Sequence, residues 1–262
     1  MATNKPLSHK TAIIVPTLGK RPEYLEACIH SILSAGDSLI VIVCPAEITY
    51  SNFVNSKVNM FVIDPGDGLA AAINCASSKL PPEIEYFNWL GDDDLLVENS
   101  IALCVDALEK NRHVAGVYGQ CEYIDQDSNK FGANLSGQWA SNILRFGPDL
   151  IPQPGALFRL DAFKAVGGLD TGYKLAFDFD LLIKLKTHGE LHYVPQLLGR
   201  FRWHSDSLSV GTRWASVIEA SRVRKSHLPF ALKSVSFFWE LPLIMTTYLA
   251  GLLLSSHLKL RR

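Results

Sequence analysis

The sequence lacks an excess of charge of either sign. Its 262 residues contain 25 Lys and Arg against 26 Asp and Glu, for a net charge of −1. A dedicated DNA- or RNA-binding protein is not expected, because such proteins rely on a strong positive field. Disorder is also excluded, since hydrophobic residues make up 48% of the chain and charged residues 19%. We expect one globular α/β unit with an appendage.

Cysteine is scarce, and its spacing points neither to disulfides nor to a zinc site. The five cysteines form an odd set with no C-x-x-C pair, and most lie in apolar runs. The N-terminus has little hydrophobic sequence. It is polar as far as Lys10, and the apolar run that follows, Ala12 to Val15, is too short for the core of a signal peptide. We therefore expect reduced thiols and a cytoplasmic protein.

Apolar runs rich in β-branched residues alternate with helical stripes along the first half of the chain. Strands are predicted at 11–15, 39–44, 58–63, 86–90 and 114–123, and helices at 22–35, 69–78 and 97–108. This alternation is typical of βαβ units and predicts a mostly parallel, Rossmann-like central sheet flanked by helices. Ligands bind such sheets beyond the carboxyl ends of the strands. A hairpin is expected at 125–137, and the acceptor-facing half from 136 onward.

An acidic run, Asp92-Asp93-Asp94, follows Gly91 directly after the strand predicted to end at Leu90. Three successive carboxylates repel one another, and a divalent cation would neutralise them. Ligation by oxygen atoms alone points to Mg²⁺ or Mn²⁺ in preference to Zn²⁺. The alternative is an acidic turn whose last Asp caps the following helix.

Two further segments carry titratable groups. Asp178 and Asp180 precede a short helix that Gly189 ends; we predict that Asp180 caps it while Asp178 faces a cleft as a general base. His204 follows a strand-like run, 197–201. It would be an ordinary surface residue without the acidic run, and becomes an additional metal ligand with it.

The order of these segments resembles the family-2 glycosyltransferases, which have the GT-A fold and transfer sugar from a nucleotide sugar with inversion. The resemblance covers about residues 11–225. The segments that carry it are Ile13-Ile14-Val15-Pro16-Thr17, Gly68 to Asn74, Leu90 to Asp94, Val166-Gly167-Gly168-Leu169-Asp170, Asp178-Phe179-Asp180-Leu181 and Arg202 to Ser207.

The resemblance implies specific roles for residues of this chain. It implies that Asp178 is the catalytic base. It implies a Mn²⁺ or Mg²⁺ site at Asp94, Asp93 and His204. Its nucleotide-sugar contacts fall on Pro16, Thr17, Arg21, Asp67, Gly68, Asn74, Asp92 and Asp93.

The chain departs from the family pattern at four places. Val43 to Glu47 has no acid pair for the nucleobase, and Ile73 replaces an Arg that often precedes the Asn of its segment. Gly91 stands where the first metal-motif acid is usual, and Phe177 stands where a Glu is usual. Two alternatives stay open. One is a sugar-phosphate nucleotidyltransferase, which would also need a parallel sheet and a metal carboxylate. The other is a catalytically degenerate sugar-binding or membrane scaffold protein, in agreement with the departures at Cys44, Ile73 and Gly91.

The C-terminal segment, 226–262, is distinct from the predicted GT-A domain, 1–225. Residues 222–262 hold seven Lys or Arg against one acid, Glu240, and the run 241–254 is mostly apolar. It falls short of the roughly 20 residues that span a bilayer. We expect a hydrophobic helical appendage at the inner face of the cell membrane, with a homodimer contact as the alternative. The expected partners are a nucleotide-sugar donor, a saccharide or lipid-linked acceptor, and the membrane surface.

Overall fold

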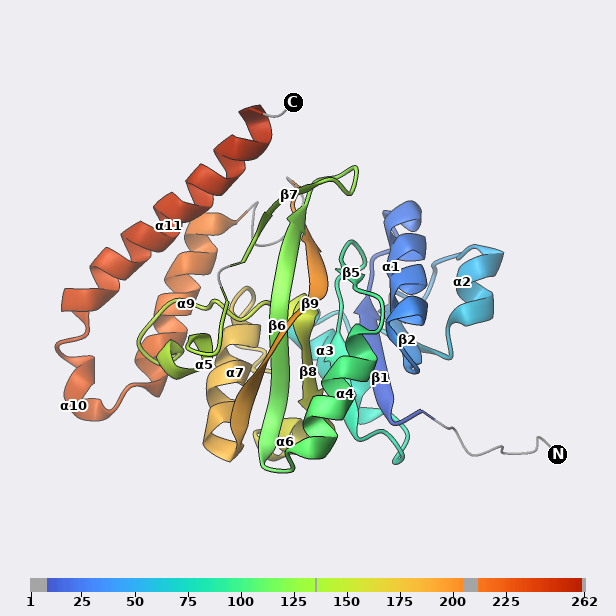
Figure 1. The fold of residues 1–262 in the computed structure, drawn as a ribbon, viewed down its shortest axis with the longest axis horizontal. Coiled ribbons are helices and arrows are strands. Elements are labelled where there is room, and N and C mark those ends of the chain that lie inside the picture. The colour runs from blue at the N-terminus through green and yellow to red at the C-terminus, as the bar shows by residue number, and fades with distance from the viewer. Residues whose placement is uncertain (1–8, 135, 205–211, 261–262) are drawn as a thin grey trace.

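A computed structural model describes residues 9–134, 136–204 and 212–260, and it contains a nine-stranded sheet flanked by helices (Figure 1). The strands are β1 (Thr11–Pro16), β2 (Leu39–Cys44), β3 (Met60–Ile63), β4 (Tyr86–Trp89), β5 (Leu95–Leu96), β6 (Val114–Ile124), β7 (Lys130–Ala133), β8 (Ala156–Arg159) and β9 (Glu190–Arg202). The helices among these residues are α1 (Pro22–Ala35), α2 (Asn52–Lys57), α3 (Leu69–Ser78), α4 (Ser100–Lys110), α5 (Ala140–Ile143), α6 (Leu160–Ala165), α7 (Phe177–His188), α9 (Arg213–His227), α10 (Phe230–Lys233) and α11 (Phe237–Leu260). A 3-10 turn, η1 (Gln153–Gly155), precedes β8.

The N-terminal half of the sheet is parallel. β2 and β4 pair with β1 on either side, and β3 pairs with β2 at the edge. β1 and β2 are almost wholly buried, as expected for parallel strands that helices cover on both faces. The strands predicted in this half are therefore confirmed, and the carboxyl ends of β1 and β4 lie side by side.

The other half of the sheet is mixed, so the prediction of a mostly parallel sheet is wrong there. The full strand order is β3-β2-β1-β4-β8-β6-β9-β5, and β7 pairs with β6. β8 runs antiparallel to both β4 and β6, whereas β6 and β9 are parallel. β8 has only four residues between η1 and α6, so its apolar pattern is too short to identify a strand.

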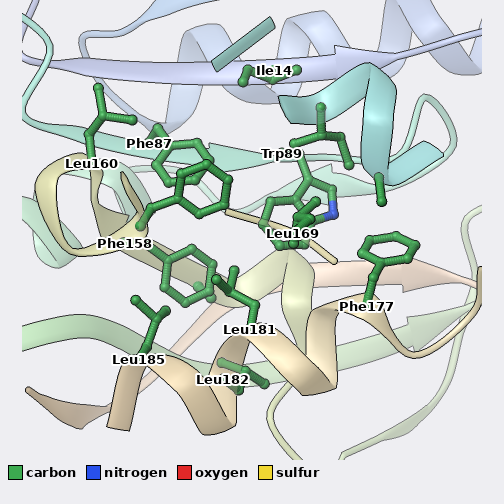
Figure 2. Packing of buried hydrophobic residues seen from close by; sticks show 14 of the residues in the cluster. Ile14, Phe87, Trp89, Phe158, Leu160, Leu169, Phe177, Leu181, Leu182 and Leu185 are labelled. Atoms are coloured by element: carbon green, nitrogen blue, oxygen red, sulfur yellow. The ribbon is translucent and has the colours of Figure 1, made fainter. Parts of the chain in front are cut away.

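The core has one cluster on each face of the sheet. Ile13 of β1 packs with α1 and α4 on one face, and Ile14 packs with α3, α6 and α7 on the other. Figure 2 shows the second cluster, where α7 contributes Leu181 and Leu185 beneath Phe158 of β8. All five cysteines lie in the described part of the chain and are free, as predicted.

The C-terminal helices form a separate layer. Figure 1 shows α11 beside α9, at the end of the molecule away from α1 and α2. The predicted boundary after residue 225 falls in the last turn of α9. Arg224 of α9 and Glu240 of α11 form a salt bridge of 2.8 Å in which both side chains are buried. A packed polar contact thus joins the two helices.

Candidate active site

The loop after β1 meets the acidic run after β4. Because these two strands are parallel neighbours, Thr17 and Asp92 emerge at the same edge of the sheet. The Thr17 hydroxyl donates to Asp92 Oδ2 at 2.6 Å and accepts from the Gly19 amide at 3.0 Å. Asp92 is buried, and that burial raises its pKa above the ordinary value, although the bond from Thr17 opposes the rise.

A guanidinium group lies between two of the three acids. Arg21, at the start of α1, donates through Nη2 to Asp92 Oδ1 at 2.9 Å and through Nη1 to Asp93 Oδ2 at 2.8 Å. The Nε2 atom of His204 lies 2.7 Å from Asp93 Oδ2 and 2.8 Å from Arg21 Nη1. Burial alone would raise the pKa of Asp93, but the His204 bond and the Arg21 charge bring it below the ordinary value.

Asp94 turns toward the other side of the loop. Its Oδ1 accepts from the Arg202 amide at 2.8 Å, because β5 pairs antiparallel with β9 directly after Asp94. Arg202 is itself buried, and its Nε donates to the Asp93 carbonyl at 2.8 Å. Burial, and next the charge of Asp93, raise the pKa of Asp94 well above the ordinary value.

The predicted ligands Asp94, Asp93 and His204 do not converge as a set. Across residues 9–134, 136–204 and 212–260, no three His, Cys, Asp or Glu side chains are grouped for metal binding. Asp93 and His204 are in contact, and Arg21 already donates to Asp93, while Asp94 is directed to Arg202.

Gly91 lies directly against two of the acids. A Cβ atom at residue 91 would lie 2.8 Å from Asp93 Oδ1 and 3.0 Å from Asp94 Oδ2. Any side chain larger than that of glycine would therefore collide with these two carboxylates. The departure from the family pattern at Gly91 leaves room for the Asp93 and Asp94 side chains. Carboxylate oxygens are the ligands that Mg²⁺ and Mn²⁺ prefer.

Asp178 lies in the first turn of α7. The preceding residue, Phe177, lies beside Trp89 at the end of β4 (Figure 2). The centroids of the two rings are 6.3 Å apart. The first turn of α7 therefore lies near the end of the strand that leads into the acidic run. Burial raises the pKa of Asp178 to about 6, and the charge of Glu219 adds to the rise. A carboxyl group with this pKa suits a general base near neutral pH.

Asp149, which the sequence did not single out, lies near enough to Asp178 for their charges to interact. Burial, and next the charge of Asp178, raise the pKa of Asp149 well above the ordinary value. Its Oδ1 accepts from the Ile151 amide at 3.1 Å. Asp149 lies in the irregular segment before η1. No periodic pattern of residues in that segment indicates where its side chains point, so the sequence could not identify Asp149.

Asp180 is not the helix cap that the sequence predicted. The N-cap residue of α7 is Ala176, and no side chain of that residue caps the helix. Asp180 is buried and pairs with Lys184 at 2.5 Å and with His227 at 2.6 Å. An Asp near a helix start can either cap the helix or form an ion pair, and Asp180 forms ion pairs. Its partner His227 belongs to α9 and lies 47 residues away in the chain.

The remaining predicted nucleotide contacts lie around the start of α3. Gly68 is its N-cap, with φ of 96°, and Asp67 is exposed beside it. The Asn74 amide donates to the Leu169 carbonyl at 2.8 Å and accepts from the Leu169 amide at 3.0 Å. Asn74 therefore holds the turn formed by Val166 to Asp170, and its contact with a nucleotide stays a prediction. Pro16 is partly buried at the end of β1. Residues 205–207 of the last family-like segment lie outside the described residues.

No protein-family model matches the chain, but individual proteins do. It is 24% identical over 222 residues, 78% of its length, to an uncharacterised glycosyltransferase of Rickettsia conorii. It is 23% identical over 186 residues to a chondroitin synthase of Escherichia coli, and 24% identical over the same length to a hyaluronan synthase of Pasteurella multocida. These matches cover 36%, 26% and 18% of the three proteins, so the chain spans only about a third of their length or less.

Solved structures share the fold. The mannosyltransferase PcManGT of Pyrobaculum calidifontis, in complex with GDP-Man and Mn²⁺, matches with a TM-score of 0.63 and 16% identity over 96% of this chain and 79% of that one. S. aureus TarS matches with a TM-score of 0.61 and 13% identity over 87% of this chain and 42% of that one. The chain thus has the GT-A type of fold, and its sequence and fold together identify it as a relative of the GT-A-type glycosyltransferases.

Proposed function

We propose that the chain transfers a sugar from a nucleoside-diphosphate sugar to a hydroxyl group of a saccharide or lipid-linked acceptor, with inversion. The observation that carries the proposal is the arrangement at one edge of a GT-A sheet. Arg21 and the acids Asp92 to Asp94 lie at the ends of β1 and β4, and Asp178 lies on the helix turn that packs against the end of β4. This proximity supports the proposal that one site holds both the groups for a charged leaving group and the base.

The donor diphosphate would bind at the loop after β1. Arg21 is a fixed cation there, one-third exposed and able to donate to a phosphate oxygen. Asp93 and Asp94 would hold Mn²⁺ or Mg²⁺, with His204 as a further ligand. Such an ion would stabilise the negative charge that develops on the leaving diphosphate. The predicted contacts of Thr17, Asp67 and Gly68 belong to this half of the site.

Asp178 would accept the proton of the acceptor hydroxyl. The hydroxyl oxygen forms a bond to the anomeric carbon as the bond from that carbon to the diphosphate breaks. The proton moves to an oxygen of Asp178. Attack on the face opposite the leaving group inverts the anomeric centre in one displacement. The pKa of about 6 leaves Asp178 ionised at neutral pH, as this role requires.

The names of two relatives support the proposed acceptor class. Two of them are named for the synthesis of polysaccharides, chondroitin and hyaluronan. We propose a cell-surface polysaccharide or glycolipid as the product, made at the cytoplasmic face of the membrane.

Helix α11 would bind the membrane surface. It is the one helix among the described residues long and apolar enough to cross a membrane by length and composition, over Phe237–Leu254. Its outward apolar side chains include Phe238, Leu241 and Leu253, which are 64–69% exposed. Its other side is committed to α9 through Glu240 and through Tyr248, whose ring packs on Trp214 at 5.3 Å. A helix bound along one side and apolar on the other suits an interfacial position better than a span.

The test of transfer is a donor screen. The purified chain, with Mn²⁺, is offered UDP- and GDP-linked sugars with saccharide acceptors, and the released nucleoside diphosphate is measured. Release that depends on acceptor, with the product in the inverted anomeric configuration, is the expected result. Nucleotide binding with formation of a nucleotide sugar from a sugar phosphate and nucleoside triphosphate would overturn it in favour of a nucleotidyltransferase.

A further inference from the structure

The segment that leads into α7 is held by a carboxylate from another helix. Glu219 of α9 is buried, at 8% exposure. Its two oxygens accept from the Lys174 amide at 3.1 Å, and Oε2 also accepts from the amides of Leu175 and Ala176, the latter at 2.8 Å. One side chain thus fixes three successive backbone N–H groups, just before the turn that carries Asp178.

The contact also satisfies a backbone amide at the start of α7. The first N–H groups at a helix start have no partner within the helix. Ala176, the N-cap residue, has no side chain that could accept a bond, and its own amide donates to Glu219. A carboxylate is favoured at this end of the helix by the positive end of the helix dipole. Within the first turn, the Phe179 amide donates to Asp178 Oδ1 at 2.8 Å.

The helix that carries Glu219, α9, is itself held by hydrogen bonds to α11. Ser221 donates to Glu240 Oε2 at 2.6 Å, and Arg224 donates to both Glu240 oxygens at 2.9 and 2.8 Å. On the same helix, His227 pairs with Asp180 of α7 at 2.6 Å. α9 is therefore tied both to α7 and to α11, and a group on a supported helix holds its geometry well.

We propose that Glu219 is a positioning residue for Asp178: by holding the backbone of residues 174–176, it fixes the direction of the Asp178 carboxylate. The inference rests on the proposed role of Asp178 as base. Two charges act on Asp178 from outside its own helix: Glu219 from α9 and Asp149 from the segment before η1, with Arg224 acting on Asp149.

The test compares Glu219→Ala and Glu219→Gln with Ser221→Ala. The serine variant loses a buried bond on the same helix but leaves residues 174–176 untouched. We expect Glu219→Ala to lower kcat at least ~10-fold while the Kd for nucleoside diphosphate stays at the wild-type value. Glu219→Gln should have a higher kcat than Glu219→Ala. In its pH profile, the fall of kcat on the acid side should move to lower pH, because a negative charge near Asp178 is gone. Ser221→Ala should keep the wild-type kcat and pH profile.

Two results would overturn the inference. One is a Glu219→Ala variant with wild-type kcat and pH profile. The other is a loss of activity in Glu219→Ala that is fully explained by the fraction of that variant that is unfolded, with an equal loss in Ser221→Ala.

Amide hydrogen exchange separates this inference from the proposed function. In Glu219→Ala the amides of 174–176 lose their acceptor and should exchange faster than in wild type and in Ser221→Ala. That readout needs no activity. A wild-type chain that transfers no sugar contradicts the proposed function, whereas unchanged exchange at 174–176 contradicts the positioning role of Glu219.

Discussion

The guanidinium of Arg21 and the carboxylate of Asp93 lie 2.8 Å apart, and this ion pair ties the start of α1 to the acidic loop after β4. The same guanidinium pairs with Asp92. A basic group is thus already present among acids that would otherwise repel one another.

Arg21→Ala is expected to destabilise the chain and to make it more responsive to divalent cations. Two largely buried carboxylates lose their partner, which costs about 1–3 kcal/mol. Mn²⁺ should then raise the Tm of the variant more than that of wild type, because it supplies the missing charge. The control is Lys20→Ala, an exposed neighbour of the same charge. Equal Mn²⁺ responses in Arg21→Ala and wild type would contradict a cation site at these acids.

Asp94→Asn is expected to abolish Mn²⁺-dependent nucleotide binding while the fold stays intact. Asn has the size of Asp and keeps a side-chain oxygen that can accept from the Arg202 amide, as Asp94 Oδ1 does, so the Tm of the variant should remain close to that of wild type. Calorimetric titration with nucleoside diphosphate, with and without Mn²⁺, measures the effect. Asp127→Asn, in an exposed loop, serves as control. Metal-dependent binding at wild-type affinity in Asp94→Asn would remove Asp94 from the ligand set.

The pH dependence of kcat should follow Asp178. A base must be ionised to accept a proton, and the pKa of this group is about 6. We expect kcat to rise as the pH increases through about 6 and to level off above that value. The profile is measured at saturating donor and acceptor. A flat profile across this range would show that another group takes the proton.

Asp180→Asn should lose stability rather than catalysis. Burial alone would raise the pKa of Asp180, but His227 and Lys184 bring it below the ordinary value. A carboxylate with a lowered pKa stabilises the fold above the unfolded pKa, about 4, and this contribution disappears as the pH falls through the folded pKa.

The measurement for Asp180→Asn is urea unfolding at neutral and acidic pH. The variant should be less stable by about 1–3 kcal/mol at neutral pH, and the difference should narrow below about pH 4. Asp106→Asn, which breaks an exposed pair with Lys110, should change little at either pH. An equal deficit for Asp180→Asn at both pH values would rule out the ion pair as its cause.

Polar substitution on the outer side of α11 should release the chain from membranes. The variant Leu241→Gln with Leu253→Gln removes two exposed apolar side chains and leaves the Glu240 contact with α9 in place. We expect wild type to sediment with anionic vesicles at low salt and this variant to remain in solution. Leu33→Gln with Leu103→Gln, on α1 and α4, is the matched control. If the wild-type chain does not bind vesicles and elutes as a dimer, the outer side of α11 contacts a second copy of the chain and not a membrane.

Much of the donor half of the site could be predicted because its residues follow strands. Apolar runs locate the ends of β1 and β4, and parallel neighbours must bring those ends together. Thr17 and Asp92 are consequently in contact although 75 residues separate them. The spacing could not show that the Arg21 side chain lies among the acids, since that depends on the path of the loop after β1.

The rest of the site depends on contacts that leave little trace in the sequence. Glu219 and Glu240 are the only acids after Asp206, in a segment otherwise rich in cations. Both are buried and both accept several hydrogen bonds. A lone acid in a basic segment is the signal that the sequence offers. The partners are set by helix packing, since Glu219 accepts from the segment before α7 and Glu240 accepts from α9. The predicted capping role of Asp180 is wrong for the same reason, because its partner His227 comes from α9.

Comparison of wild type with Asp178→Asn tests whether Asp178 is the base for sugar transfer at this nucleotide site. Release of nucleoside diphosphate from the preferred donor gives kcat, and calorimetry gives the Kd for the nucleotide. We predict an unchanged Kd and a kcat lower by ~10²–10⁴-fold, the loss typical of removing a general base. A variant that turns over at the wild-type rate, or one that loses nucleotide binding together with turnover, would contradict the account.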